Sequence, residues 1–164
     1  MMTTNLDPFD IKILNIMQRD NLAPLKVISE QINLSIAATA KRLKRLRKER
    51  YILNDVSLLN PKLLDLNVTV IVKFSLNIET EQKLNKIKHK LKACDYISHC
   101  FYVAGDFDFI IILSVKDLAE YETIIQKLFL DDPNINKFNS HIVLNSVKNI
   151  TQLPLSGGTN ELAK

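Results

Sequence analysis

The segment 33-NLSIAATAKRLKRLRKER-50 decides how the N-terminal part of this chain folds. It opens on a tight turn, 33-NLS-35, and Ser35 can cap the helix that follows. Leu43 and Leu46 recur at helical spacing, so they form the buried stripe, completed by Ala40 or flanked by a snorkelling Arg47. The segment therefore predicts a turn followed by a helix with one apolar face.

Two further helices are predicted upstream of this turn. In residues 6–20, Asp7 can cap a helix and Pro8 suits its first turn. The apolar stripe of that helix is Phe9, Ile13, Ile16 and Met17. Pro24 marks the start of a second helix, which we expect to end at Asn33, a residue that tolerates a left-handed backbone. The second and third helices then form a helix-turn-helix.

Positive charge is concentrated on the third helix. Residues 41–50 hold seven basic residues and one acid, whereas the rest of the chain holds 15 basic and 17 acidic residues. The whole net charge of +4 therefore comes from one segment. Such asymmetry points to a nucleic acid or another acidic surface as the partner.

We predict that this helix contacts double-stranded DNA. Ala37 and Ala38 are small enough for the helix to approach base edges, and the arginines can reach guanine or phosphate. We assign Ala37, Ala38, Lys41, Arg42 and Arg45 to the face opposite Leu43 and Leu46, with Lys44 and Lys48 flanking that face. The full predicted contact set is Ser35, Ala37, Ala38, Thr39, Lys41, Arg42, Lys44, Arg45 and Lys48. The simpler alternative is a solvated charged face.

Several classes of protein are disfavoured by composition. The chain has 164 residues, 46% of them hydrophobic, and no apolar run approaches the ~20 residues of a membrane helix. The N-terminus has no secretory signal pattern, so we expect a cytoplasmic protein with no membrane partner. Cys94 and Cys100 do not form a CxxC pair, and the three histidines, His89, His99 and His141, form no metal motif.

From residue 68 the periodicity changes to that of a βαββαβ domain. Strands are expected at 68–76, 96–104, 107–115 and 137–148. Helices are expected at 79–92 and after Asp117, which can cap together with Glu120. Residues 51–53 and Val56 favour a short strand and a linker. The fold class is therefore α+β, a helix-turn-helix followed by a ferredoxin-like domain.

The stretch 103-VAGDFDFIIIL-113 holds the single glycine that precedes residue 157. We expect Gly105 and Asp106 to form a two-residue hairpin turn, where glycine supplies a positive φ without steric cost. That turn does not explain Asp108, which lies past it in an apolar strand.

One face of the predicted sheet needs a partner. On strand 107–115, Phe107 and four further alternating residues share one face, while Ile110 and Ile112 lie on the other with Asp108. Two helices cover only one side of a four-stranded sheet. We therefore expect the second face to meet the same sheet of another chain; the alternative is that the N-terminal domain covers it.

These segments together resemble the Lrp/AsnC, or feast/famine, family of regulators. The resemblance runs from about Leu6 to Val147 and rests on LDPFDIKIL, INLS, RLKRLRKERYI, LLNPKLL and VAGDFDFI. It implies a winged helix-turn-helix at 1–53, a linker at 54–66, an effector-binding and oligomerisation domain (RAM domain) at 67–150 and a tail at 151–164. From Pro154 we expect the tail to be disordered or to cross to a partner chain.

The resemblance also implies a homo-oligomer, a dimer assembling into a tetramer or octamer, that binds an amino acid between dimers. No other cofactor is implied. Carried over by position, the effector-binding residues are Ala104, Gly105, Asp106, Asp108, Leu118, His141, Ile142 and Val143. The acids would meet the ammonium group of the effector or hold the hairpin by hydrogen bonds. The family commonly has glycine at the positions of Asn33 and Arg50 and often proline at that of Ile36.

The leading prediction is a sequence-specific transcriptional regulator, not an enzyme, associated with the nucleoid. One alternative is an architectural protein that wraps DNA with little sequence preference. Another is an enzyme resembling decarboxylases of a modified tetrapyrrole. No arginine follows Arg50, which argues against binding a polycarboxylated substrate in the second domain.

Overall fold

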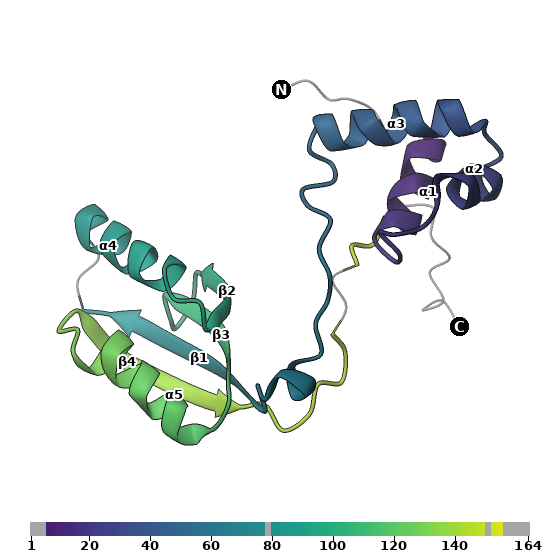
Figure 1. Ribbon diagram of the computed structural model, residues 1–164. Helices are drawn as coiled ribbons and strands as arrows, with labels where there is room; N and C mark the ends of the chain where they lie inside the picture. Colours follow the sequence, from purple (N-terminus) through teal and green to yellow (C-terminus); the bar gives the residue numbers. More distant parts are fainter. Residues whose placement is uncertain (1–5, 78–79, 150–151, 156–164) are drawn as a thin grey trace, which may run out of the picture. The chain divides into compact units, whose positions relative to one another are not determined.

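The computed structural model describes residues 6–77, 80–149 and 152–155 (Figure 1). The chain divides into two compact units. One contains the residues up to Leu58 together with the segment after Val147, and the other runs over Leu59–Val147. Each unit has its own apolar core.

The first unit is built on three helices: α1 (Pro8–Met17), α2 (Leu25–Ile32) and α3 (Ile36–Lys48). Asp7 and Asp10 form a reciprocal capping box at the start of α1, which satisfies two backbone N–H groups. Asn33 ends α2 with a left-handed φ of 56°. The Ser35 hydroxyl then accepts the Ala38 N–H and caps α3. The predicted helix-turn-helix is present with the predicted caps.

The core of the first unit is made by one stripe from each helix: Ile13, Leu14, Met17, Ile28, Ile32, Leu43 and Leu46. The segment 152–155 belongs to this unit. The Gln18 side chain exchanges two hydrogen bonds with the Leu153 backbone, of 2.8 and 3.1 Å. Leu155 packs against the helical core. The start of the tail that we expected to be disordered or to cross to a partner chain therefore packs against its own chain; residues 156–164 lie outside the described part.

The prediction of a short strand at residues 51–53 is wrong. Residues 51–60 carry no strand, and a 3-10 turn, η1 (Pro61–Leu64), follows. The reason lies at the end of α3, where the Tyr51 N–H donates to Leu46 O (2.9 Å) and the Arg50 N–H to Arg47 O (3.1 Å). These bonds close the helix end, so the backbone at Tyr51 and Ile52 completes a cap.

The second unit is a four-stranded antiparallel sheet covered on one face by two helices (Figure 1). Its elements are β1 (Val68–Leu76), α4 (Glu81–Lys92), β2 (Ile97–Tyr102), β3 (Phe109–Val115), α5 (Leu118–Ile125), which continues as a π-helical turn at Gln126–Leu130, and β4 (Ile135–Ile142). The sheet order is β2-β3-β1-β4. This is the ferredoxin-like arrangement that the pattern predicts.

Alternation along the two central strands separates the faces of this sheet. Every second residue of β3 from Phe109 to Val115 is buried, as is every second residue of β1 from Val70 to Leu76. These side chains meet the helices around three aromatic rings, with Phe74 stacked on Phe109 at 5.0 Å and tilted against Phe129 at 4.7 Å. The partly exposed Ile110 and Ile112 lie on the other face, as predicted, and Ile71 of β1 lies there with them.

The β2–β3 connection is longer than the predicted two-residue turn. The strands end at Tyr102 and begin again at Phe109, and the loop is closed by a bond from the Val103 N–H to Asp108 O (2.8 Å). Gly105 has a φ of +146°, so the need for glycine is confirmed. A Cβ there would meet no atom of the chain within 4 Å, so backbone conformation alone requires the glycine.

Phe107 lies in this loop and not in β3. Its ring sits beside the Lys73 Nζ (5.2 Å) and the Lys137 Nζ (5.9 Å), which belong to the uncovered face of β1 and β4. The prediction that Phe107 shares a face with Phe109 is therefore wrong, because strand alternation does not extend into the loop.

We predict that Arg50→Gly stabilises the first unit. Arg50 has a φ of 62°, a conformation that costs a residue with a Cβ about 1–2 kcal/mol. Glycine removes this strain but adds disorder to the unfolded chain, so the net gain is about 0.5–1 kcal/mol. Urea unfolding of the full chain measures it.

Asn33→Gly is the matched control for that substitution, because Asn33 has a similar φ of 56° yet tolerates it better. Its expected gain is smaller. A lower unfolding midpoint for Arg50→Gly than for the unchanged protein contradicts the strain at Arg50.

Candidate functional sites

The outer face of α3 carries a row of lysines. Lys41, Lys44 and Lys48 are exposed and follow Ala37 at helical spacing along one side of the helix. Among the described residues, none of these three ammonium groups has a carboxylate within ion-pair distance. We call Lys41, Lys44 and Lys48 the lysine stripe. It is an uncompensated positive surface on a rigid helix.

The two arginines between these lysines face the other way, toward α1. Asp10 is fully buried, and its carboxylate accepts hydrogen bonds from the guanidinium groups of Arg42 (2.9 Å) and Arg45. Arg42 also donates to Asp7 (2.6 Å) and lies 5.4 Å from the Phe9 ring centre. The buried charge is thus compensated by two cations from the neighbouring helix.

This network shifts two pKa values. The pKa of Asp7 is lowered, chiefly because the Asp10 N–H donates to its carboxylate and also because Arg42 lies beside it. The pKa of Arg42 is raised, first through its hydrogen bond with Asp7. Because the pKa of Asp7 is lowered in the folded chain, its charged carboxylate stabilises the fold fully at pH values above its ordinary pKa of 3.8. This stabilisation is lost as the pH falls below 3.8.

The predicted face assignment of Arg42 and Arg45 is therefore wrong. They flank the buried stripe on its α1 side, with their side chains 27% and 39% exposed, and are held in ion pairs. Thr39 is also misassigned: it is fully buried, and its hydroxyl donates to Ser35 O (3.0 Å). Thr39, not Ala40, completes the stripe with Leu43 and Leu46.

The remaining residues of the predicted DNA-contact set stay accessible. Ser35 and Ala37 are exposed and Ala38 is partly exposed at the start of α3. Ile36 stands beside them and is 51% exposed. At the far end, Arg47 pairs with Asp55 (3.0 Å) and so holds the segment that leaves the helix.

The predicted effector-binding residues fall into two groups at opposite ends of the sheet. Ala104, Gly105 and Asp106 are exposed in the loop beside the end of β1, where the Asp108 N–H donates to Phe74 O (3.0 Å). At the other end, the Val143 N–H donates to Thr69 O (2.9 Å). Thr69 and Phe74 are separated by roughly 17 Å of extended strand.

The second group consists of Leu118, His141, Ile142 and Val143. Leu118 begins α5 close behind the end of β3 at Val115, and is 49% exposed. His141 and Ile142 are exposed at the end of β4. A single chain therefore does not bring the two groups into one pocket.

Asp108 has a structural partner within its own chain. Its carboxylate accepts the Leu76 N–H (2.8 Å) at the point where the register between β1 and β4 shifts. A backbone donor freed by the irregular pairing is thus satisfied by a side chain. The hydrogen-bonding role that the sequence left open for this acid is present, although it holds the end of β1 and not the hairpin.

Neither a metal site nor a membrane span is found in the described residues. They contain no group of three or more histidine, cysteine or acidic side chains placed to hold a metal ion. In the same ranges, no helix is both long enough and apolar enough to cross a bilayer.

A helix-turn-helix with an exposed cationic helix, joined to a ferredoxin-like domain, defines a DNA-binding protein with a separate second module. Comparisons with known proteins agree for both units. Residues 6–52 match a winged helix-turn-helix DNA-binding family, and residues 69–153 match the Lrp/AsnC ligand binding domain. The leucine-responsive regulatory protein of Haemophilus influenzae is 34% identical over 150 residues, which cover 92% of this chain and 90% of that protein.

Solved structures share the whole fold. A transcriptional regulator from Neisseria meningitidis, solved as an L-Met complex, has a TM-score of 0.88 at 23% identity, covering 93% of this chain and 98% of that one. The feast or famine regulatory protein from M. tuberculosis, complexed with L-methionine, has a TM-score of 0.79 at 19% identity, covering 91% and 99%. The chain belongs to the Lrp/AsnC family of transcriptional regulators, so the resemblance and fold class predicted from sequence are confirmed.

The most consequential residue of the first unit, Asp10, was missed from sequence. A signal was present: Asp10 lies three residues after the capping Asp7, at the position where a capping-box acid is expected. Nothing in the local pattern shows that two arginines more than 30 residues later share its carboxylate.

We predict that Asp10→Ala destabilises the first unit by about 3–5 kcal/mol, the usual loss when one partner of a buried ion pair is removed. Hydrogen exchange of the α1 and α3 amides in the full chain measures this, since the two units can open separately.

Lys44→Ala is the control, because an exposed side chain without an ion-pair partner changes stability by only about 0.5 kcal/mol or less. If the exchange of α1 and α3 is equally slow in Asp10→Ala and Lys44→Ala, Asp10 does not hold these helices together.

Proposed function

We propose that this regulator contacts DNA through the lysine stripe, with the start of α3 facing the groove. The observation that carries the proposal is the row of Lys41, Lys44 and Lys48, exposed and without ion-pair partners in the described structure. An α-helix fits the major groove, and lysines along its outer side reach phosphates on the flanking strands. Ala37 leaves room for close approach at the helix start.

The chemistry of the exposed side bears on specificity. Arg42 and Arg45, the side chains best suited to bidentate contact with guanine, are held by Asp10. The exposed lysines are point charges that favour phosphate contact. Base readout is then left to the first turn of α3, at Ser35, Ala37 and Ala38, together with the shape of the DNA.

An architectural role is the second candidate function, and the lysine stripe is the observation that favours it. A surface that contacts mainly phosphates binds many sequences with similar affinity. Competition between a duplex from the protein's own promoter and random duplexes of equal length distinguishes the two. Preference for the promoter supports specific regulation, and equal affinity supports the architectural role.

We propose that two chains pair through the uncovered faces of their sheets. Ile71, Ile110 and Ile112 lie there, and Phe101 joins them as the cross-strand partner of Ile110, 49% exposed. An apolar face of this kind is buried in a stable arrangement. Pairing also gives the protein two α3 helices for two half-sites on DNA.

An amino-acid effector fits this assembly. The relatives from Neisseria meningitidis and M. tuberculosis were solved with L-methionine, and we propose an amino-acid ligand for this chain as well. Because the predicted effector-binding residues lie at two ends of the sheet, a shared site needs residues from more than one chain. A ligand bound there would favour one assembly over another and so change DNA binding.

We propose a cytoplasmic, nucleoid-associated regulator without enzymatic activity. The tetrapyrrole decarboxylase alternative has no role for the lysine stripe, and no arginine follows Arg50 in the sequence to bind a polycarboxylate.

We predict that replacing Lys41, Lys44 and Lys48 together by glutamine weakens DNA binding and flattens its salt dependence. Each lost phosphate contact reduces the slope of log K against log salt by about 0.9, so the triple variant loses about 2–3 per protomer. Fluorescence anisotropy across a salt series measures the slope.

The control replaces three lysines of the second unit, Lys83, Lys86 and Lys127, by glutamine and so removes the same net charge. An equal change of slope in both triple variants would show that overall charge, and not the lysine stripe, governs binding.

We predict that Ile112→Asp converts the assembled protein to monomers, because it places a charge in the centre of the pairing face. Light scattering measures the mass, and circular dichroism checks the fold. Leu130→Asp, a 66% exposed position in the turn after α5, is the control. If the Ile112→Asp protein keeps the assembly mass of the unchanged protein, the interface between chains does not lie on this face.

A further inference from the structure

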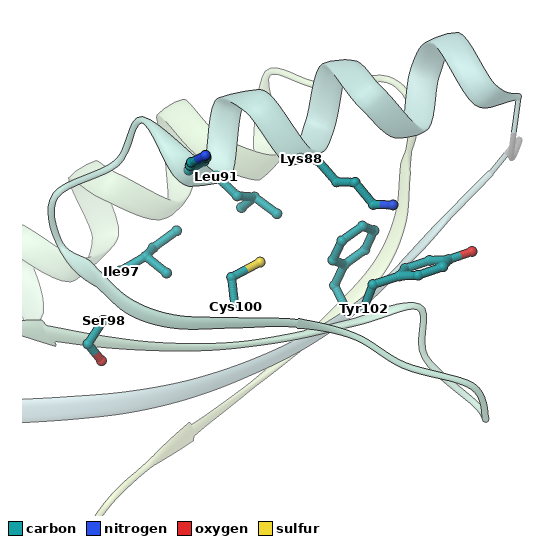
Figure 2. Close-up of a pocket in the computed structure, with 8 residues that line it drawn as sticks. Lys88, Leu91, Ile97, Ser98, Cys100 and Tyr102 are labelled. Carbon is teal, nitrogen blue, oxygen red and sulfur yellow. The ribbon is translucent and has the colours of Figure 1, made fainter. Parts of the chain in front are cut away.

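A hollow lies between α4 and the edge strand β2, on the helix-covered side of the sheet (Figure 2). Its volume is about 390 Å³. In Figure 2 the side chains of Lys88 and Leu91 descend from α4, and those of Ile97 and Cys100 rise toward them from β2. We call this space the α4–β2 hollow. It lies away from the uncovered face that we assign to chain pairing.

A bulge in β2 builds the floor of this hollow. Ile97 pairs with Leu113 and His99 with Ile112, so Ser98 is an extra residue in the ladder. Its hydroxyl donates to Ile112 O (3.1 Å). The bulge places Ile97 on the same side as Cys100, whereas strict alternation would separate them.

The inner wall of the hollow is apolar. Leu91 and Phe109 are each 1% exposed and close its base, with Ile97 beside them. The Tyr102 ring lies 5.0 Å from the Phe109 ring and extends this wall outward. Cys100 is exposed to solvent, but desolvation by its apolar neighbours raises the pKa of its thiol, so this group is neutral at ordinary pH and adds to the apolar surface.

The rim of the hollow is cationic. Lys88 and Lys92 lie one helical turn apart on α4, and both line it. The Lys88 Nζ stands 4.6 Å from the centre of the Tyr102 ring. None of the described residues that line the hollow is acidic. An apolar wall beneath two cations is complementary to an amphipathic anion.

We propose that the α4–β2 hollow binds an organic carboxylate with an apolar body. The carboxylate lies between Lys88 and Lys92, and the hydrocarbon part packs on Leu91, Ile97 and Phe109. At about 30 Å³ for each water-sized unit, the space accommodates roughly a dozen non-hydrogen atoms. An acid such as octanoate is of this size.

A second hollow, along α5 and the π-helical turn that follows it, differs in its charge. It is lined by Cys94, Tyr96, Glu120 and Lys127, among others, and has a volume of about 340 Å³. Glu120 accepts hydrogen bonds from the Tyr96 hydroxyl (3.1 Å) and the Lys116 N–H (2.7 Å). Its carboxylate disfavours an organic anion there. The two hollows therefore provide an internal comparison, with one cysteine in each.

Cysteine alkylation in the full-length protein tests the proposal. Octanoate bound in the α4–β2 hollow covers Cys100 and leaves Cys94 accessible, so it slows alkylation of Cys100 by iodoacetamide at least several-fold. Mass spectrometry of the two cysteine peptides gives both rates in one sample. Octylamine, with a matched chain and the opposite charge, is expected to give no protection.

Substitutions test the role of the rim. Lys88→Gln with Lys92→Gln should weaken octanoate binding by roughly tenfold, as expected for two partly solvated charge contacts. Lys86→Gln with Lys83→Gln removes equal charge from α4 at positions that do not line the hollow, and should leave binding unchanged. Calorimetry measures the affinities.

Three results would overturn the proposal: equal protection of Cys94 and Cys100, equal protection by octanoate and octylamine, or no protection of Cys100. None of these readouts involves DNA, so failure here is distinct from failure of the proposed DNA contact.

Discussion

The buried carboxylate of Asp10 is the constraint on which the DNA-binding unit depends. A charge without solvent contact needs compensating partners, and here both come from α3 through Arg42 and Arg45. Because the carboxylate belongs to the first turn of α1, these contacts fix the rotation of α3 about its own axis. The rotation in turn decides which basic residues face outward.

Two kinds of positive charge on α3 thus have different roles. Planar guanidinium groups suit a buried carboxylate that accepts several hydrogen bonds, and compact ammonium groups suit a solvated surface. Lysines and arginines alternate along 41-KRLKRLRK-48, and this alternation puts the two residue types on different sides of one helix. The second unit separates its sides in the same way: buried residues alternate with Ile71, Ile110 and Ile112, which we assign to chain pairing.

Local patterns predicted most of the fold and only part of the site. Apolar periodicity and capping residues correctly indicated the helix-turn-helix and the βαββαβ order. They misassigned Thr39, Arg42 and Arg45, because periodicity places a stripe on a helix but does not show which neighbouring helix lies beside it. Phe107 was misassigned because the loop after β2 interrupts alternation. Pairings between distant segments, such as Asp10 with Arg45 or Asp108 with Leu76, leave no signal in a single sequence.

The most direct test is an NMR titration of the full-length protein with a short DNA duplex, following the side-chain nitrogens of lysine and arginine. On our account the ammonium signals of Lys41, Lys44 and Lys48 shift on binding, while the guanidinium signals of Arg42 and Arg45 keep the shifts and slow exchange of their ion pairs with Asp10. Large shifts of the Arg42 and Arg45 guanidinium signals, with the three lysines unchanged, would contradict the division of roles on α3.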